Sequence, residues 1–362
     1  MTHSRELSSR ERVRLAFSFQ EPDQIPCNHF GTPEITRLLQ EHFGVNDEDG
    51  LQDALGVDFR TVMSDYLGPG YKTNQDGVFR DFWHVPHRYV AVAGGHYPEP
   101  IAPPFAKTTD LAEVERWPWP ELDWFDCSKL HARCLKNRDY CIVAGTAGAM
   151  DIINGLGNMR GYEQALVDLV TQEPIGMALV EKRFGFWYAW CRKCLQACRG
   201  EVDILHIGDD YGMQSGLVLS PEQWRVVAEP YLRRMVELAH ESGAKLMLHS
   251  CGSTRELMDD FIRVGVDILD TVQPYAANME PAELKTSYQG RLAFHGMVSV
   301  QKVLPATGPD GVAREVARIC EVMKPGGGFA IAPTHNIQPD TPLENVLALY
   351  ESVRQYGAYT RR

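Results

Sequence analysis

The sequence predicts an α/β barrel of the (β/α)8 type, and two observations carry that prediction. From Tyr140 onward, short apolar runs alternate with amphipathic helical stretches. This alternation is typical of β-α units, which build a parallel sheet that is buried on both faces. Each apolar run also ends in polar or ionisable residues, as barrel strands do at their carboxyl ends, where catalytic groups gather.

Six apolar runs are the predicted strands, and helices are predicted between them. The strands are 141–144, 204–207, 246–248, 268–269, 292–294 and 329–331, and the helices include 221–242, 253–264 and 311–323. A doubly wound open sheet is the competing architecture. Its Gly-rich dinucleotide turn, G-x-G-x-x-G at the start of a helix, is absent from this sequence. The barrel is therefore the better prediction.

The N-terminal third carries two helix starts and an irregular segment. Ser8-Ser9-Arg10-Glu11 is a capping-box pattern, and a second helix is expected to begin near Pro33 after a brief extended piece. Residues 66–124 are rich in proline, glycine and aromatic side chains, with a small hairpin expected at 78–83 and 88–92. We interpret this segment as an insertion over the active site of a single barrel domain that spans residues 1–362.

Composition narrows the class of function. The chain has 362 residues, is 44% hydrophobic, and carries a formal net charge of −12 without a Lys/Arg cluster, which argues against a nucleic-acid partner. No segment approaches the ~20 apolar residues that span a bilayer. The polar N-terminus has no signal-peptide core, and nine cysteines do not suggest a disulfide framework. We expect a cytoplasmic protein that acts on a small molecule, without a membrane partner.

A candidate metal site lies in Leu248-His249-Ser250-Cys251-Gly252, where an apolar run ends. Residues two apart on a strand point the same way, so His249 and Cys251 offer imidazole and thiolate on one face, which suits zinc. His335, after another apolar run, is a third candidate ligand, and a hydrogen-bonding or general-acid role for it is equally open. The competing interpretation is a buried polar turn in which Cys251 only packs.

Other strand-end residues are candidates for catalysis or substrate binding. Adjacent side chains on a strand point to opposite sides, so only one of Asp209 and Asp210 is expected to face the barrel mouth. That one would be a fourth metal ligand, a partner for a histidine or a general base, and the other a cap on the next turn. We take Asp209 as the catalytic candidate beside His335. The candidates for substrate binding are Asn28, His29, Asp210, Gln273 and His295.

Several of these motifs, in this order, resemble one superfamily: the uroporphyrinogen decarboxylases together with the cobalamin-linked coenzyme M methyltransferases. The resemblance runs from about residue 10 to 355. It is carried by Gly208-Asp209-Asp210-Tyr211-Gly212, by the His249/Cys251 motif and by the stretch from Ala332 to Pro342. It implies a barrel with its active site in the mouth, and often a homodimer. The fold alone does not fix the reaction, since one fold hosts several chemistries.

The methyltransferase branch is the better match within this superfamily. That branch holds zinc with a His-x-Cys pair and a later cysteine, which the resemblance places at His249, Cys251 and, with histidine in place of cysteine, His335. True uroporphyrinogen decarboxylases carry an arginine motif for their polycarboxylate substrate, and residues 26–33 here contain no arginine. A histidine in place of the second thiolate also weakens the case for coenzyme M as the acceptor.

The function expected from the sequence is therefore that of a zinc-dependent methyltransferase. A corrinoid would have to arrive on a partner protein, because the corrinoid-ligating motif Asp-x-His-x-x-Gly is absent. One alternative is a metal-independent decarboxylase or lyase that acts on a small carboxylated substrate. Another is a non-catalytic subunit that binds a corrinoid or another small molecule.

Overall fold

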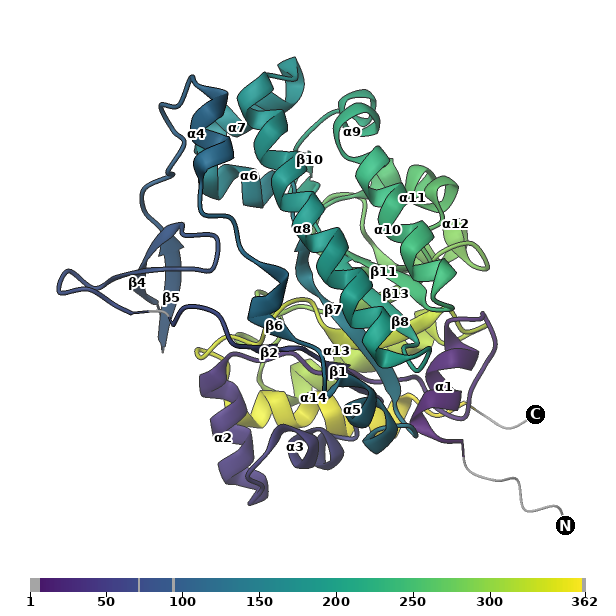
Figure 1. Ribbon diagram of the computed structural model, residues 1–362. Helices are drawn as coiled ribbons and strands as arrows, with labels where there is room; N and C mark the ends of the chain where they lie inside the picture. The colour runs from purple at the N-terminus through teal and green to yellow at the C-terminus, as the bar shows by residue number, and fades with distance from the viewer. Residues whose placement is uncertain (1–6, 71, 93–94, 360–362) are drawn as a thin grey trace, which may run out of the picture.

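A computed structural model describes residues 7–70, 72–92 and 95–359, and its centre is a curled parallel sheet (Figure 1). Seven strands lie in the order β1-β7-β8-β11-β12-β13-β14, and each pairs in parallel with its neighbours. Their bounds are Phe59–Val62 (β1), Cys141–Met150 (β7), Ile204–Gly208 (β8), Lys245–His249 (β11), Ile268–Val272 (β12), Ala293–Val298 (β13) and Phe329–Pro333 (β14). All six predicted strands are present, and the predicted α/β barrel class is confirmed.

The gap between the first and last strands is closed by the extended segment 25–31. Cys27 bridges Ile331 of β14 in parallel, and the backbone N–H of Asn28 donates to the Ile331 carbonyl at 2.9 Å. On the other side, the N–H of Asp58, directly before β1, donates to the Cys27 carbonyl at 2.9 Å. This segment therefore takes the place of an eighth strand and completes the cylinder.

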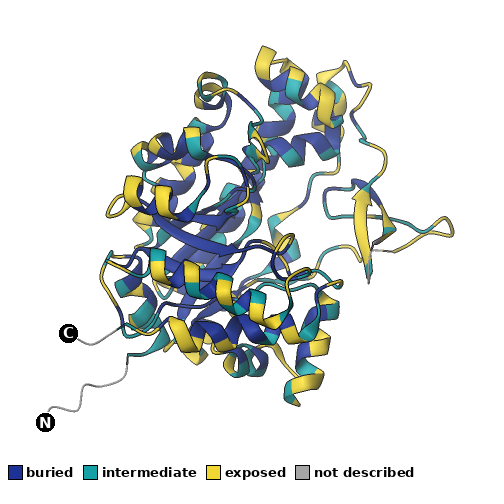
Figure 2. Ribbon diagram, turned by 180° about the vertical axis from the view of Figure 1, so that it is seen from behind, coloured by how far each residue is buried: buried dark blue, intermediate teal, exposed yellow. Residues whose placement is uncertain are grey.

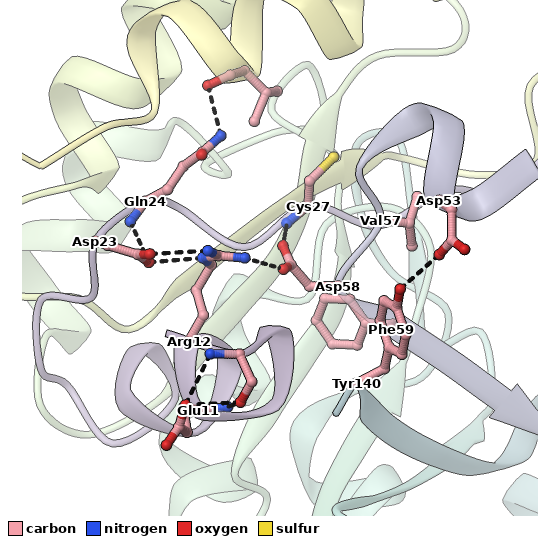
Figure 3. Close-up of polar contacts among 12 residues, drawn as sticks. Glu11, Arg12, Asp23, Gln24, Cys27, Asp53, Val57, Asp58, Phe59 and Tyr140 are labelled. Atoms are coloured by element: carbon pink, nitrogen blue, oxygen red, sulfur yellow. Dashed lines mark hydrogen bonds and ion pairs between the residues drawn. The ribbon is translucent and has the colours of Figure 1, made fainter. Parts of the chain in front are cut away.

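A salt-bridge cluster fixes this closing segment to the first helix (Figure 3). Arg12 of α1 (Ser9–Ala16) lies 2.7 Å from the Asp23 carboxylate and 2.6 Å from that of Asp58. Asp58 also accepts the N–H of Cys27 at 2.9 Å. Burial raises the pKa of Asp58, against the lowering effect of Arg12. One carboxylate thus joins the helix, β1 and the closing segment.

Helices cover the outside of the cylinder, and their inner faces are buried while their outer faces are exposed (Figure 2). They are α2 (Pro33–Phe43), α3 (Glu48–Leu55), α5 (Leu130–Lys136), α8 (Pro174–Cys198), α9 (Pro221–Val227), α10 (Glu229–Glu241), α11 (Met258–Val264), α12 (Pro281–Tyr288), α13 (Gly308–Met323) and α14 (Leu343–Tyr356). None of the helices in the described ranges combines the length and the apolar character that a bilayer crossing needs.

The local signals predicted the starts of α1 and α2 correctly, but the helix predicted over 253–264 begins only at Met258, after a 3-10 turn, and a second predicted helix is divided. Ser8 and Glu11 form the expected capping box of α1, and α2 begins at Pro33. The helix predicted over 221–242 is two helices, α9 and α10, which are separated at Ala228. Pro230 stands in the first turn of α10, where a proline is tolerated, but it cannot continue a preceding helix because its ring removes an N–H donor.

The insertion over 66–124 lies at the side of the barrel. The predicted hairpin is present as β3 (Val78–Arg80) and β4 (Pro86–Val92), and β5 (Gly95–Pro100) extends it to an antiparallel sheet of three strands. This sheet stands away from the barrel, and its strands are largely exposed (Figures 1 and 2). The insertion also contains α4 (Leu111–Arg116) and a 3-10 turn at Leu122–Trp124. At its two ends, β2 (Asp65–Tyr66) pairs with β6 (Phe125–Asp126).

Three further groups of short elements follow the carboxyl ends of barrel strands. Helices α6 (Ile153–Arg160) and α7 (Tyr162–Thr171) follow β7. The hairpin of β9 (Gly212–Met213) and β10 (Gly216–Leu217) follows β8, and a 3-10 turn at Arg255–Leu257 follows β11. These segments build the walls around the strand ends.

Candidate metal centre and cavity

The His249 and Cys251 side chains meet at the carboxyl end of β11. His249 is the last residue of the strand, and Cys251 follows two positions later, so both project toward the same side. Their Nε2 and Sγ atoms lie 3.6 Å apart. The two-residue spacing therefore brings the imidazole and the thiol together on one side, as predicted from the sequence.

Asp210 supplies a third donor from the neighbouring strand end. It follows β8, which pairs with β11, and its Oδ1 atom lies 3.8 Å from His249 Nε2. The same oxygen accepts the backbone N–H of Cys251 at 2.9 Å, while the other accepts from Asn154 of α6 at 2.8 Å. One donor atom each from Asp210, His249 and Cys251 lies within 4.8 Å of the others.

These three residues offer the kinds of donor atom that zinc takes in proteins, and the spacing of the His249 and Cys251 donors agrees with such a site. Zinc bonds of ~2.0–2.1 Å to nitrogen and ~2.3 Å to sulfur place the two ligand atoms about 3.6 Å apart at a tetrahedral angle. The observed separation of His249 Nε2 and Cys251 Sγ is 3.6 Å. Three protein ligands would leave room for a substrate or water ligand, as in catalytic zinc sites.

A buried carboxylate, Asp270 of β12, lies behind His249. Asp270 Oδ2 is 2.9 Å from His249 Nδ1 and 3.0 Å from His206 Nε2, and Oδ1 is 2.6 Å from His295 Nδ1. We call these four residues the imidazole hub. Asn28 Nδ2 lies 3.2 Å from the second ring nitrogen of His295. His206, His249 and Asp270 also have donor atoms within 4.8 Å of one another, but hydrogen bonds already occupy those atoms.

The hub fixes both the charge of Asp270 and the orientation of His249. Burial alone would raise the pKa of Asp270, but the three histidines outweigh it and hold that pKa well below its ordinary value. Burial alone would lower the pKa of His249, but Asp270 and Cys251 raise it well above the ordinary value. Because the Nδ1 atom of His249 is directed at Asp270, its Nε2 atom faces Cys251. Carboxylates orient metal-binding histidines in the same way.

Asp209 faces a helix terminus instead of the cavity. Its carboxylate accepts the backbone N–H of Ile153, at the start of α6, at 3.0 and 3.3 Å. The side chain is buried, and burial together with the nearby Asp151 raises the pKa of Asp209 well above its ordinary value. The two adjacent aspartates do point to different sides, and Asp210 is the one beside His249. A catalytic role for Asp209 remains a prediction.

His335 lies at the edge of this site. Its ring centroid is 6.3 Å from that of His249, and the side chain is exposed. It lines the same cavity as Cys251, but it belongs to neither group of close donor atoms among the described residues. Both roles considered for His335, metal ligand and acid or base, remain predictions.

The other candidates for substrate binding fall into two places. Gln273 lines the cavity beside Cys251 and accepts the backbone N–H of Gly252 at 3.1 Å. Asn28 and His295 are buried in and around the hub. His29 points elsewhere: its Nδ1 is 2.5 Å from the Tyr350 hydroxyl of α14. Contact of these residues with a substrate stays a prediction.

Two cavities meet at His335. The inner one, about 110 Å³, is bordered by Phe30, His206, His249 and Thr271 among others. The outer one, about 490 Å³, is bordered by Cys251, by residues that follow β8, β12 and β13, and by Tyr97 of β5. The insertion therefore contributes to the wall of the outer cavity. We call Asp210, Cys251, Gln273 and His335 the rim.

Two glycines fix the loop that carries Cys251. A Cβ on Gly212 would lie 2.7 Å from the Cys251 carbonyl oxygen, and a Cβ on Gly252 would lie 2.6 Å from the carbonyl carbon of Gly212. Gly252 also has a φ of +74°, which favours glycine. The backbone N–H of Ser253 donates to the Met213 carbonyl at 2.8 Å. Backbone thus packs directly on backbone beneath the rim.

Sequence reasoning assigned no role to His206 or Asp270. A signal for them was present, because each is an ionisable residue inside an apolar run: Ile204-Leu205-His206-Ile207 and Ile268-Leu269-Asp270. Ionisable side chains on buried strands need partners, so two of them on different strands of one sheet point to a shared network.

Comparisons with solved structures find one protein with the same overall fold and two with weaker similarity. A methyltransferase from Methanosarcina mazei superposes with a TM-score of 0.65 at 17% identity, covering 97% of this chain and 99% of that chain. D-psicose 3-epimerase from Clostridium cellulolyticum H10 (TM-score 0.38, 12% identity, 67% of this chain and 86% of that chain) and 7,8-dihydropteroate synthase from Vibrio fischeri ES114 (0.33, 14%, 91% and 93%) are more distant. No curated protein matches.

Structural similarity at such low identity shows only the fold. The family is shown by a match to a family model. The model of the uroporphyrinogen decarboxylase (URO-D) family matches residues 143–356, a range that includes most of β7, every later strand of the barrel and the entire rim. The match covers more than half of the chain, and the chain therefore belongs to the uroporphyrinogen decarboxylase (URO-D) family.

Proposed function

We propose that this protein is a zinc-dependent methyltransferase whose metal is held by His249, Cys251 and Asp210. The observation that carries the proposal is the convergence of one nitrogen, one sulfur and one carboxylate oxygen within 4.8 Å at the barrel mouth. Membership in the URO-D family and the fold shared with the Methanosarcina methyltransferase support it. The ligand set expected from the sequence was His249, Cys251 and His335. In the proposed set Asp210 takes the third place, and His335 lies at the edge of the site.

The chain's own residues would position the ion and the reactants. Asp270 orients His249 so that its Nε2 atom faces Cys251, where the metal would be held, and Asn154 holds the Asp210 carboxylate in place. Zinc in such a site lowers the pKa of a bound thiol or other nucleophile. His335, which is exposed on the cavity wall, would take up the proton that this nucleophile releases.

The transfer itself moves a methyl group without oxidation or reduction of the acceptor. The bond between the methyl carbon and its donor breaks with the electron pair left on the donor, and the carbon bonds to the nucleophile as its proton departs. We propose a corrinoid on a partner protein as the methyl donor. The outer cavity, open beside Cys251, is where donor and acceptor would meet.

Metal analysis of the purified full chain tests the proposal. We expect close to one zinc per chain after purification in zinc-supplemented medium. The variants His249→Ala, Cys251→Ser and Asp210→Asn should lose most of that zinc. His42→Ala is the matched control, because His42 is exposed on α2 far along the chain from the site.

Two results would overturn the proposal. One is a wild-type protein with less than half an equivalent of zinc under these conditions. The other is zinc content that stays unchanged in all three variants. A zinc-free protein that binds small carboxylates would instead favour the decarboxylase or lyase alternative.

A further inference from the structure

The outer cavity is lined by a set of side chains of one chemical kind. Its volume of about 490 Å³ lies in the range of small-molecule sites, and it opens directly on Cys251 and His335. Four of its wall residues are glutamines: Gln214, Gln273, Gln301 and Gln338. Each amide offers donors and an acceptor without a charge. Such a wall matches hydroxyl or amide groups on a ligand.

The same wall offers little to an anion. Of the described residues that line the outer cavity, none is a lysine or an arginine. A sulfonate, carboxylate or phosphate that leaves water needs charge-assisted hydrogen bonds in exchange, and arginine or lysine usually provides them. Neutral amides replace only part of that interaction.

The proposed metal ligands do not supply the missing positive charge. The two positive charges of a zinc ion would be matched by the Cys251 thiolate and the Asp210 carboxylate, while His249 binds as a neutral imidazole. A second carboxylate, that of Asp270, lies behind His249, with its Oδ2 atom 2.9 Å from His249 Nδ1. An anionic group that reaches past the metal into the outer cavity would therefore meet neutral amides and nearby negative charge.

We propose that the outer cavity selects an uncharged acceptor, a thiol that carries hydroxyl or amide groups, over acceptors with an anionic tail. The inference rests on the proposed function, because it assumes that Cys251 and its neighbours hold a metal that binds the acceptor thiol. It goes further by naming the chemical class of the molecule that occupies the cavity.

Two thiols of nearly equal size test this selection. The full-length protein is loaded with Co²⁺ in place of zinc and titrated with 2-mercaptoethanol or with 2-mercaptoethanesulfonate. The sulfur-to-cobalt charge-transfer absorption reports how much thiol is bound, independently of any turnover. We expect 2-mercaptoethanol to bind roughly tenfold tighter, the ratio that one missing charge-assisted hydrogen bond produces.

A variant supplies the missing cation. Gln301→Lys places an ammonium group on the cavity wall, and we expect it to tighten sulfonate binding by roughly tenfold and so to remove the preference for 2-mercaptoethanol. Gln196→Lys is the matched control, because Gln196 is exposed on α8 and does not line the cavity.

The outcomes separate this inference from the function on which it rests. If 2-mercaptoethanesulfonate binds wild-type protein as tightly as 2-mercaptoethanol or more tightly, the selectivity is wrong and the metal-activated thiol stands. If cobalt binds but neither thiol changes its spectrum, both the uncharged thiol acceptor and the thiol-activating role are wrong. If Gln301→Lys leaves the preference unchanged, the cavity wall is not what sets it.

Discussion

The imidazole hub and the rim both contain aspartate and histidine side chains, but they differ in burial and in how fully their histidines are paired. In the hub, Asp270 and His295 are at most 1% exposed, and both carboxylate oxygens are occupied by imidazole nitrogens. At the rim, His335 is exposed and Cys251 is partly exposed, and both border an open cavity. His249 belongs to the hub through Nδ1 and faces the rim through Nε2.

This contrast shows how one histidine is prepared for binding. A polar network whose members are all paired holds its shape, because each lost partner would leave a buried group unsatisfied. A donor that is to bind a ligand must instead keep an accessible, uncommitted atom. His249 meets both needs: its Nδ1 atom is held by the hub, which orients the ring, and its Nε2 atom faces the rim, where a ligand would bind.

The largest expected effect comes from breaking the hub at Asp270. The variant Asp270→Asn keeps the shape of the side chain but removes the charge that three histidines share. We expect the free energy of unfolding to fall by about 3–5 kcal/mol, as when one partner of a buried ion pair is removed. Denaturant unfolding measures it.

The control for this variant is Asp259→Asn, an exposed partner of Arg291, which should change stability by less than about 0.5 kcal/mol. In refolded Asp270→Asn protein, zinc affinity should also fall by roughly 10–100-fold, because His249 loses its orienting partner. If both the stability and the zinc affinity of Asp270→Asn equal those of the control, the hub does not support the site.

His29 lies beside a tyrosine hydroxyl and not beside a carboxylate as the hub histidines do, so its contribution to stability should depend on pH in a different way. Burial lowers the pKa of His29 to about 4, so His29 is neutral in the folded protein at pH 7. Its unfolded value is near 6.5, and the unfolded chain therefore binds more protons between these two values. Stability from this group is complete above pH ~6.5 and declines as the pH falls through about 4, by about 3–4 kcal/mol in total.

The variant His29→Gln should remove that part of the acid sensitivity. Unfolding free energies at pH 7 and pH 4.5, compared between wild type and variant, give the measurement. The difference between the two proteins should shrink or reverse at the lower pH. An identical pH dependence in both would show that His29 does not titrate as its burial requires.

The smallest expected effects distinguish Asp209 from its neighbour Asp210. Asp209→Asn weakens the cap on α6 and should cost about 1 kcal/mol of stability, with zinc content unchanged. Asp210→Asn should do the reverse, losing zinc while stability without metal changes by less than about 1 kcal/mol. Unfolding curves of the metal-free proteins and metal analysis of the loaded ones distinguish the two. Zinc loss in Asp209→Asn alone would exchange their roles.

Much of the fold follows from periodicity and local signals. Apolar runs on β7, β8 and β11 to β14 identify strands that are buried on both faces, and the capping box places the start of α1. The strand β1 was missed because it is only four residues long and includes Arg60 and Thr61. The closing segment 25–31 has few ladder contacts, so its role in the barrel depends on tertiary packing and leaves no clear pattern.

The site was predictable to the extent that its residues share a strand end. His249 and Cys251 lie two positions apart, so strand geometry alone brings them together. The assignment of Asp209 and Asp210 to opposite sides followed from the same rule, but which one faces the mouth depends on the register between β8 and β11. The hub could not be located because it joins β8, β11, β12 and β13, whose order in space is not written in any local pattern.

The close packing of Gly212 against Gly252 has a consequence for protein engineering. A mutant library that diversifies the turn around Cys251 to change its specificity has two positions that must stay fixed. The obstruction at each is main chain and not a movable side chain, so no compensating substitution elsewhere can make room. Variation should therefore be directed to the glutamines of the outer cavity, where side chains can change without displacing the turn.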